Sequence, residues 1–436
     1  MDKKPGLETL AIHAGYTPDR DTGSRAVPLY LSASFVFDDA DDAARRFALE
    51  SFGPIYTRLG NPTTSVLETR LAACHGCTGA TAAATGMAAI FNTIVTLASQ
   101  GQNFVTTRSL YGGTVTLFNS DLRRFGIEPR YVDSSNAANY EEKIDENTRF
   151  LYCEAVGNPK GNVDDFEAIA AVAHRHGLPL VMDATFAPPP LFDPVGAGVD
   201  VVIHSLTKLI GGHGAAMGGI TIENPDFDWK ASGKFPQLTE PDESYHGVNF
   251  WDAFGGHDKA VARGQALTLK IRAGVLRNIG ATISPFNSWQ IMTGLETLPL
   301  RAKKHCENAM KVAEWLSGHP LVEWVEYAGL PSHPDYARAK KYMPYGPGAV
   351  FGFGVKGGFE AGRKVLNNVK LIALLVNVLD AKSCITHPAS TTHVQLTPEE
   401  RRAGGVLPEL LRLSVGIEDA DDIMADLDQA LKAATA

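Results

Sequence analysis

Four side chains in this sequence have the types and the order needed to hold one flat, phosphorylated cofactor. Asp183 ends one apolar run, and Ser205, Thr207 and Lys208 follow the next. A lysine amine can form a Schiff base with an aldehyde, and a carboxylate can pair with a protonated ring nitrogen. The two hydroxyls beside the lysine can bind a phosphate. Together these needs predict pyridoxal 5'-phosphate (PLP) and an enzyme that acts on amino acids.

The two central residues also have structural interpretations. Lys208 is followed by apolar residues and glycines, so a buried lysine in an ion pair fits as well as a nucleophile. Burial would lower the pKa of the amine and make it more nucleophilic. Asp183 could instead cap the following turn. If it binds the cofactor, it keeps the ring nitrogen protonated, and the ring can then stabilise a carbanion at the substrate α-carbon.

Two further segments connect a strand-like run to a helix. Thr85, Gly86 and Met87 begin a predicted helix, whose free N–H groups and dipole suit a phosphate, although small residues are common at helix starts. Tyr111 precedes two glycines, between a predicted strand and a predicted helix. Its ring could stack on a flat cofactor and its phenol could move protons. A tyrosine packed at a turn explains the same pattern equally well.

Arg412 stands between two leucines in a strand-like run, which favours a buried or cleft-facing guanidinium. Arginine binds carboxylates through two parallel hydrogen bonds. We therefore expect Arg412 to hold a substrate carboxylate, with Ser383 and Asn158 as neutral partners. Arg58, beside Tyr56 in an N-terminal loop, has no such context, and a lone arginine in a loop is usually solvated.

Strand-like and helix-like segments alternate through the middle of the chain. The strand-like runs are residues 103–107, 149–154, 178–183 and 200–204, and the helical patterns include 86–98 and 164–176. Such alternation predicts an α/β fold with a mostly parallel sheet. Ligands of these sheets bind at the carboxyl ends of the strands, where Glu154, Asp183 and Ser205 are expected.

The chain divides into three predicted parts. An N-terminal arm contains one short helix with Asp38 as its N-cap, and the next helix begins at Pro62. A smaller α+β domain ends the chain. The predicted ranges are the arm, 1–60; the PLP-binding α/β domain, 61–265, with an ordered loop at 223–256; and the C-terminal domain, 266–436, with helical patterns at 300–316 and 419–434 and strand patterns at 349–355 and 411–415. A further helical pattern at 259–279 spans the boundary between the last two.

Composition excludes several classes of protein. The 436 residues are 44% hydrophobic and 20% charged, which argues against disorder. The net charge of −9 offers nothing to attract nucleic acid or anionic lipid. No apolar run approaches the roughly 18 residues of a membrane-spanning helix, and the N-terminus has no signal-peptide pattern.

The five cysteines are sparse and odd in number, which indicates a reducing compartment, and we expect the cytoplasm. Cys74 and Cys77 form a single CxxC motif. A metal or redox site would need a second pair of ligands or a strand-to-helix context, so we expect no metal and interpret the motif as a helix end capped by Gly76.

Five motifs in the same order resemble the Cys/Met-metabolism PLP-dependent enzymes, from about Leu7 to the C-terminus. The motifs are residues 56–63, 85–89, 183–187, 205–208 and 412–419. The resemblance implies the PLP-dependent transferase fold type I. It also implies an active dimer, usually paired into a homotetramer.

The same resemblance implies a role for each matched residue. Lys208 would carry the cofactor and move protons, and Asp183 would pair with the ring nitrogen. Tyr111 would stack on the ring and assist the leaving group. The other implied roles are phosphate binding by Gly86, Met87, Ser205 and Thr207, contacts to a neighbouring subunit's phosphate by Tyr56 and Arg58, and carboxylate binding by Arg412, Ser383 and Asn158.

Within the family, the passages 231–236, 240–247 and 380–393 are most similar to the O-acetylhomoserine sulfhydrylase branch. This likeness implies a γ-replacement in methionine biosynthesis, in which sulfide or a thiol displaces acetate from O-acetyl-L-homoserine and gives homocysteine or methionine. Methionine γ-lyase, cystathionine γ-synthase and O-succinylhomoserine sulfhydrylase are alternatives on the same scaffold. A non-catalytic PLP-binding protein is disfavoured because Lys208 is present.

Four positions depart from the family pattern. Ala184 replaces a frequent asparagine, and the segment 74–77 replaces an acidic turn. Leu379 stands where many sulfhydrylases have glycine, so the local backbone could differ there. Gly113 stands where methionine γ-lyases often have cysteine, which argues mildly against a lyase.

Overall fold

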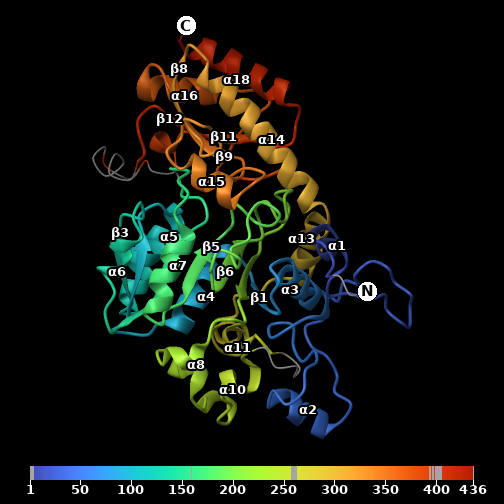
Figure 1. Cartoon of the computed structure of the whole chain (residues 1–436). Helices are drawn as coiled ribbons and strands as arrows, with labels where there is room; N and C mark the ends of the chain where they lie inside the picture. Colours follow the sequence, from blue (N-terminus) through green and yellow to red (C-terminus); the bar gives the residue numbers. More distant parts are fainter. Residues whose placement is uncertain are drawn as a thin grey trace.

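Two sheets organise the molecule, one in each half of the chain (Figure 1). The computed structural model describes residues 4–158, 160–256, 263–391, 394, 397 and 405–435. The larger sheet has seven strands in the order β1-β7-β6-β5-β4-β2-β3, and the smaller has five in the order β10-β11-β12-β9-β8. The predicted α/β fold with a smaller C-terminal α+β part is confirmed.

The larger sheet is parallel except at β7, which runs antiparallel to both β1 and β6. Three of the four predicted strands begin within one residue of their expected start. The fourth, β5, begins at Leu180 because Pro179 has no N–H group to contribute to the ladder. The strands are β1 (Gly79–Ala83), β2 (Asn103–Thr107), β3 (Glu128–Val132), β4 (Thr148–Glu154), β5 (Leu180–Asp183), β6 (Val201–Ser205) and β7 (Gly219–Glu223).

Side-chain caps fix the starts of the helices that lead into this sheet. The Asn61 side chain accepts a hydrogen bond from the N–H of Thr63 at 2.9 Å, and Pro62 takes the first turn of its helix, as predicted. The helices around the sheet are α3 (Pro62–Cys74), α4 (Gly86–Leu97), α5 (Gly112–Thr116), which continues as a π-helix (Leu117–Leu122), α6 (Ala138–Glu141) and α7 (Phe166–Arg175).

The N-terminal arm differs from the prediction in two details. It contains two helices, α1 (Leu7–His13) and α2 (Ala40–Phe47), where one was expected. The N-cap of α2 is Asp39, whose carboxylate accepts from the N–H of Asp42 at 2.7 Å, so the prediction of Asp38 was wrong by one residue.

The predicted ordered loop at 223–256 is ordered, but it contains short helices. Trp229 and Phe235 are buried and join the hydrophobic cluster beside α4. The predicted helical pattern that follows lies partly outside the described residues, since 257–262 are not among them. The elements are α8 (Trp229–Ser232), α9 (Pro236–Thr239), a 3-10 turn (Glu243–Tyr245), α10 (Phe250–Phe254), α11 (Ala266–Ile271), a π-helix (Arg272–Leu276) and α12 (Arg277–Ile279).

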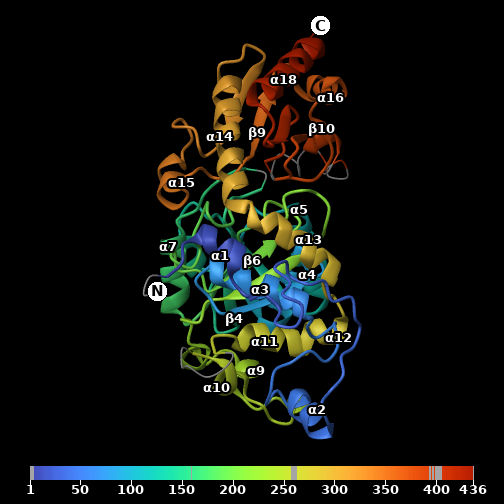
Figure 2. The same ribbon diagram turned by 90° about the vertical axis from the view of Figure 1, so that its right-hand side faces the viewer.

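The smaller sheet follows a long helix, α14, which rises from α13 into the C-terminal half (Figure 2). Residues 266–296, expected in the C-terminal domain, pack against α3 and α4 of the first half. The elements are α13 (Pro285–Glu296), α14 (Leu298–Ser317), β8 (Val322–Glu326), α15 (Tyr336–Tyr342), β9 (Val350–Val355), α16 (Gly358–Asn368), β10 (Ala373–Leu374), β11 (Cys384–Thr386), a 3-10 turn (Pro388–Ser390), β12 (Leu410–Ser414) and α18 (Ala420–Thr435).

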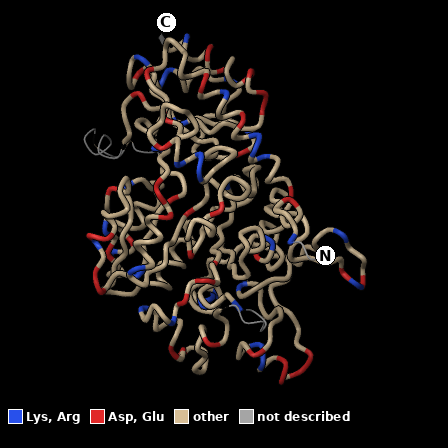
Figure 3. The backbone as a smooth tube through the Cα atoms, in the orientation of Figure 1, with Lys and Arg blue, Asp and Glu red and all other residues tan. Residues whose placement is uncertain are grey.

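Basic and acidic residues are interspersed along the backbone trace (Figure 3). In the described ranges, no helix combines the length and the apolar character needed to cross a membrane. All five cysteines are unpaired. Cys74 ends α3, and Gly76 just beyond it has a φ of 71°, so the CxxC motif does form a helix end with Gly76 in the left-handed conformation.

Candidate active site

The carboxyl ends of β4, β5 and β6 bring the predicted groups to one edge of the sheet. Glu154 and Asp183 are directly paired in register at the ends of their strands, and Ser205 ends β6. The N–H of Tyr111 donates to Oε1 of Glu154 at 2.7 Å. The sheet therefore places Tyr111 and Asp183 around one carboxylate, Glu154, whose pKa burial and the nearby Asp183 raise well above its ordinary value.

Asp183 carries a carboxylate that a cation beside it would stabilise. Burial raises its pKa, while hydrogen bonds from Thr185 oppose that rise. Those bonds come from the Thr185 N–H at 3.0 Å and its hydroxyl at 2.5 Å. Among the residues that the structure describes, no cationic side chain pairs with Asp183. A protonated ring nitrogen would supply the missing cation.

Lys208 lies in the turn after β6 and reaches the C-terminal half of the chain. Its Nζ donates to Oδ1 of Asn377 at 2.6 Å. Burial lowers the pKa of the amine, and the positive charge of Arg412 lowers it further. Both effects favour the neutral amine, which is the form that attacks an aldehyde. The predicted ion pair of Lys208 with an acid is not present in the described part of the chain.

Arg412, on β12, has a guanidinium N–H that makes no hydrogen bond to the described residues. Its Nη2 donates to the carbonyl of Val376 at 3.3 Å, whereas its Nε is buried without a hydrogen-bond partner among the described residues. An unsatisfied buried guanidinium N–H is costly. A carboxylate beside Arg412 would satisfy it through a paired interaction.

The start of α4 and the end of β6 form a tight cradle of backbone. A Cβ atom at Gly86 would lie 2.7 Å from the Cβ of Ser205, and one at Gly219 would overlap the carbonyl oxygen of Thr85. The Thr85 side chain caps α4 by accepting from the N–H of Ala88 at 3.0 Å. Glycine at 86 and 219 thus leaves the helix start open beside Ser205, as a phosphate requires.

Thr207 and Met87 flank this cradle. The hydroxyl of Thr207 accepts from the N–H of Gly218 at 3.1 Å, which closes the turn that carries Lys208. Met87 is the second residue of α4, and its sulfur accepts from Thr114 at 3.9 Å. Both side chains lie where the sequence motifs predict phosphate contacts, and those contacts remain predictions.

Tyr111 immediately precedes α5, and the residue is 49% exposed. A Cβ atom at Gly113 would lie only 2.6 Å from Cε1 of this ring. Glycine at 113 is therefore what permits the observed ring position. An exposed ring at the edge that holds Asp183 is free to stack on a flat ligand.

The prediction for Ser383 does not fit its contacts. Its hydroxyl donates to Oε2 of Glu418 at 2.9 Å and accepts from the N–H of Gly416 at 2.8 Å, and the residue is buried. The hydroxyl closes a turn and has no free capacity directed at a substrate. Asn377, which contacts Lys208, is the residue of this segment that reaches the site. Asn158 is buried just after β4, and its role as a carboxylate partner remains a prediction.

Asn377 was missed from the sequence, although a signal was present. It is the only uncharged polar residue in the apolar run 371–379, where a buried or cleft-facing amide would be expected to have a partner. The nearby departure at Leu379 is real in the backbone, because Leu379 has a φ of 57°, the left-handed region that glycine adopts without strain. The N–H of Leu379 donates to Oγ of Ser414 at 2.7 Å, which helps to hold that conformation.

Tyr56 and Arg58 lie on the arm, and both are exposed. The Arg58 guanidinium stacks 5.5 Å from the centre of the Tyr56 ring and donates to the carbonyl of Arg277. These contacts hold the pair against the end of the π-helix that precedes α12. Their predicted contact with a phosphate in a neighbouring subunit remains a prediction.

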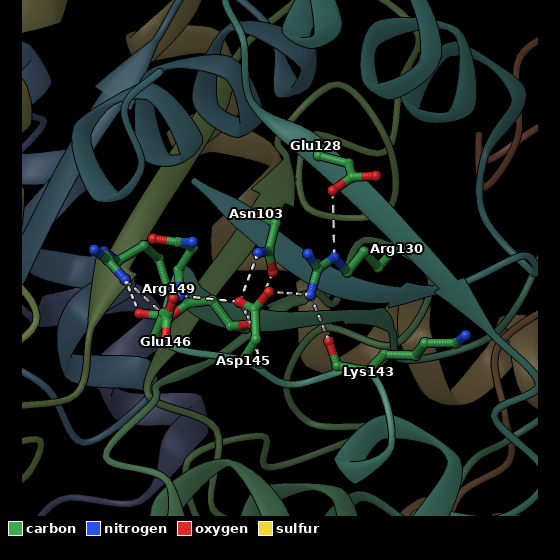
Figure 4. Close-up of polar contacts among 9 residues, drawn as sticks. Asn103, Glu128, Arg130, Lys143, Asp145, Glu146 and Arg149 are labelled. Atoms are coloured by element: carbon green, nitrogen blue, oxygen red, sulfur yellow. Dashed lines mark hydrogen bonds and ion pairs between the residues drawn. The ribbon is translucent and has the colours of Figure 1, made fainter. Parts of the chain in front are cut away.

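A separate hollow of about 490 Å³ lies along the edge strand β3 and is lined by charged side chains (Figure 4). Arg130 pairs there with Asp145 at 2.7 Å and with Glu128 at 3.3 Å. Asp145 also accepts from the amide of Asn103 at 2.9 Å. Burial raises the pKa of Asp145, but hydrogen bonds from Asn103, Arg130 and the backbone outweigh that effect and bring the pKa to about 2. Arg130, Asp145 and Glu128 therefore satisfy one another at the hollow.

The fold and the lysine-centred edge define a PLP-dependent enzyme of fold type I. The family model described as Cys/Met metabolism PLP-dependent enzyme matches residues 8–432, and the chain belongs to that family. The predicted family and cofactor are thereby confirmed.

Several relatives cover almost the whole chain. The O-acetyl-L-homoserine sulfhydrylase of Leptospira meyeri is 49% identical over 98% of this chain and 96% of its own length. The homocysteine synthase of Schizosaccharomyces pombe is 46% identical and covers 98% of each chain. A crystal structure of a candidate O-acetylhomoserine (thiol)-lyase from Campylobacter jejuni, which contains a pyridoxyl-lysine monophosphate, has a TM-score of 0.92 at 38% identity and covers 98% of this chain and 99% of its own.

The residues present fit PLP at each point that the structure tests. The unpaired carboxylate of Asp183, the open start of α4 beside Ser205, and the amine of Lys208 would hold the ring nitrogen, the phosphate and the aldehyde carbon in turn. The sequence did not reveal Thr185 as a partner of Asp183, because a threonine two residues after a strand end is common.

Proposed function

We propose that this protein catalyses a γ-replacement on O-acetyl-L-homoserine, in which sulfide or a thiol takes the place of acetate and gives L-homocysteine or methionine. The observation that carries the proposal is the unsatisfied Nε of Arg412 close to Lys208, because it provides a carboxylate site beside the reactive amine. The names of the relatives support the acyl group and the product.

Each residue then has a defined task. PLP, when bound, supplies the electron sink that stabilises negative charge at the substrate α-carbon. Arg412 holds the substrate carboxylate, and Asn377 orients the Lys208 amine. Lys208 removes and returns the proton at the α-carbon, and its lowered pKa favours the neutral amine that this task requires. Asp183 keeps a proton on the ring nitrogen.

Tyr111 is the group suited to assist the departure of acetate from Cγ. Its exposed phenol can donate a proton to the leaving oxygen while the carbon–oxygen bond breaks, and the new carbon–sulfur bond forms when sulfide or a thiolate attacks the same carbon. The close fit of Gly113 against the ring supports this role of Tyr111, since a larger residue at 113 would displace the phenol.

We include a homodimer, paired into a homotetramer, in this proposal. The arm exposes Leu31, Val36 and Phe47 at 72%, 91% and 58%, and such apolar side chains favour burial against a second copy. Arg58 and Tyr56, exposed on the same arm, would then complete the neighbour's phosphate site. Mixing Lys208→Ala and Arg58→Ala subunits tests this point, because one intact site re-forms in each mixed dimer only if Arg58 acts across the interface. No recovery of activity on mixing would contradict it.

The activity itself is tested by a product assay on PLP-loaded protein with O-acetyl-L-homoserine, with and without sulfide. Homocysteine and acetate formed only with sulfide are the expected result. α-Ketobutyrate and ammonia formed regardless of sulfide would identify a γ-lyase instead. Turnover only with the succinyl ester, or only with cysteine as the acceptor, would identify O-succinylhomoserine sulfhydrylase or cystathionine γ-synthase.

A further inference from the structure

Arg301, in the first turns of α14, is a buried arginine whose guanidinium contacts the segment that carries Lys208. Its Nη1 donates to the carbonyl of Leu209 at 2.8 Å, and its Nη2 donates to the carbonyl of Ile210 at 3.1 Å. Nη2 also donates to the carbonyl of Gly294 at 2.6 Å, and Nε donates to the hydroxyl of Thr297 at 3.2 Å. One side chain therefore joins the two residues after Lys208 to the junction between α13 and α14.

Glycines make room for this arrangement. Gly212 has a φ of 69°, and a Cβ atom there would overlap Nη1 of Arg301. A Cβ atom at Gly294 would overlap the carbonyl oxygen of Gly211. Glycine at these positions therefore lets the backbone on both sides of the guanidinium pack more closely than a side chain would allow.

The turn that Arg301 holds is continuous with Lys208. The N–H of Gly212 donates to the carbonyl of Lys208 at 2.7 Å, and the N–H of Gly211 donates to the carbonyl of Leu206 at 2.9 Å. From the other half of the chain, the N–H of Ala381 donates to the carbonyl of Gly212 at 2.9 Å. Lys208 itself contacts Asn377 of that half.

The chemistry of Arg301 is unusual for a purely structural group. Its four hydrogen-bond acceptors are neutral oxygens, and in the described ranges no carboxylate forms an ion pair with it. Burial lowers its pKa to about 10, with a partial opposing effect from Asp380. Burying a cation among neutral groups is costly, and an apolar residue would avoid that cost.

We propose that Arg301 is a positioning residue for Lys208: it fixes the backbone that follows the lysine and ties that backbone to the α13–α14 junction. The amine is thereby held at one place relative to Asn377 and the phosphate cradle. Arg301 touches neither substrate nor cofactor in this role. The inference depends on Lys208 as the nucleophile and not on which acyl group or thiol the enzyme uses.

The test measures how PLP-free protein captures PLP at Lys208, which requires no substrate. Arg301→Lys and Arg301→Gln are compared with Arg70→Lys, a matched control, because Arg70 is also buried and donates to the carbonyl of Ala14 and to Glu296. Capture is followed by borohydride trapping and peptide mass spectrometry. The pKa of Lys208 is measured separately by competitive acylation, and the Tm is recorded for every variant.

We expect both Arg301 variants to capture PLP more slowly by between about 10- and 100-fold, since small displacements of a reacting group cost that much. We also expect the pKa of Lys208 to shift, and Arg70→Lys to lower the Tm without changing capture. Equal capture rates and an unchanged Lys208 pKa in all three variants would overturn the proposal, whatever their Tm values.

If the Arg301 variants fail to fold, Thr297→Val decides the question. It removes the acceptor of Nε and the hydrogen bond from the Thr297 hydroxyl to the carbonyl of Gly294, and it leaves the guanidinium in place. Slower capture of PLP, with a fall in Tm no larger than that of Arg70→Lys, supports positioning. Unchanged capture overturns it. A failed product assay with normal PLP capture would contradict only the proposed substrate and leave this inference standing.

Discussion

Two charged regions at opposite sides of the larger sheet behave differently. At the edge strand β3, Arg130 has Asp145 and Glu128 as partners around an open hollow (Figure 4). At the carboxyl ends of β4 to β6, Asp183 has no cationic partner among the described residues. Arg412, which reaches the same site from β12, has a buried Nε with no hydrogen-bond partner among them. In the first region Arg130 forms two ion pairs. In the second region, among the described residues, Asp183 lacks a cationic partner and Nε of Arg412 lacks a hydrogen-bond acceptor. Hollow space alone therefore does not identify the site. An unsatisfied buried group does so only together with the chemistry around it, because Nε of Arg149, near the first region, is also buried without a partner among the described residues.

The largest effect is expected when the Lys208 amine in the second region is removed. Lys208→Ala should lower turnover by at least about a thousandfold and abolish covalent attachment of PLP, because the nucleophile and proton carrier are both lost. Steady-state turnover and the absorbance of the linked cofactor measure the two effects. Lys230→Ala is the matched control, since the Lys230 side chain is 60% exposed and pairs with Asp252. Retained attachment in Lys208→Ala would contradict the assignment.

The next test compares the two arginines directly. Arg412→Met should raise KM for the amino-acid substrate by roughly 10- to 100-fold, since a charge-assisted contact to the carboxylate is lost. Arg130→Met should leave KM unchanged and affect only the local stability of the β3 edge. Initial-rate kinetics on both variants make the comparison. Equal changes in KM would show that the unsatisfied Nε does not mark the carboxylate site.

The sequence predicted the parts of this contrast that depend on strand ends. Glu154, Asp183 and Ser205 were placed correctly because apolar runs and the following polar residue define where a buried strand stops. Arg412 was found because a charge between two leucines in a strand pattern is rare. Such signals depend on neighbouring residues and can therefore be recognised in the sequence.

What the sequence did not predict depends on contacts between distant segments. Ser383 and Asn377 lie six residues apart, and only the fold decides that Glu418 binds Ser383 while Asn377 reaches Lys208. Arg301 was not singled out from the sequence, because three of its four acceptors are backbone carbonyls, which have no sequence signature. The side chains that finish a site through long-range contacts are the ones that a pattern cannot show.

A smaller effect is expected from Gly113→Ala, which adds a methyl group against the Tyr111 ring. The ring is half exposed and can move, so the Tm should change little. The phenol would leave its present position, and kcat should fall roughly 10-fold because general-acid assistance depends on placement. Thermal unfolding and kcat with O-acetyl-L-homoserine are measured together. A normal kcat would remove Tyr111 from the leaving-group step.

The smallest effect on catalysis is expected from His204, which directly precedes Ser205 and lies in the core. His204 on β6 contacts His75 at the end of α3, with 3.0 Å between the two Nε2 atoms, and both rings are buried. Burial lowers the pKa of His75 to about 4, and burial together with His75 lowers that of His204 well below its ordinary value. One neutral ring donates to the other, so both Nε2 atoms have a hydrogen-bond partner. Arg130 likewise has partners, whereas Nε of Arg412 has none among the described residues.

The pair should appear in acid stability. An unfolded histidine binds its proton near pH 6.5, whereas folded His75 resists protonation until about pH 4, so the unfolded chain holds more protons in that window. The free energy of unfolding should therefore fall as the pH drops from 6.5 to 4, by up to about 1.4 kcal/mol per pH unit for each histidine. His75→Leu/His204→Leu should flatten this slope in denaturant titrations and leave kcat near pH 8 unchanged. An unchanged slope between pH 6.5 and 4 would show that the two histidines do not control stability there, since a carboxylate such as Asp145, with a folded pKa of about 2, loses its contribution mainly below that window.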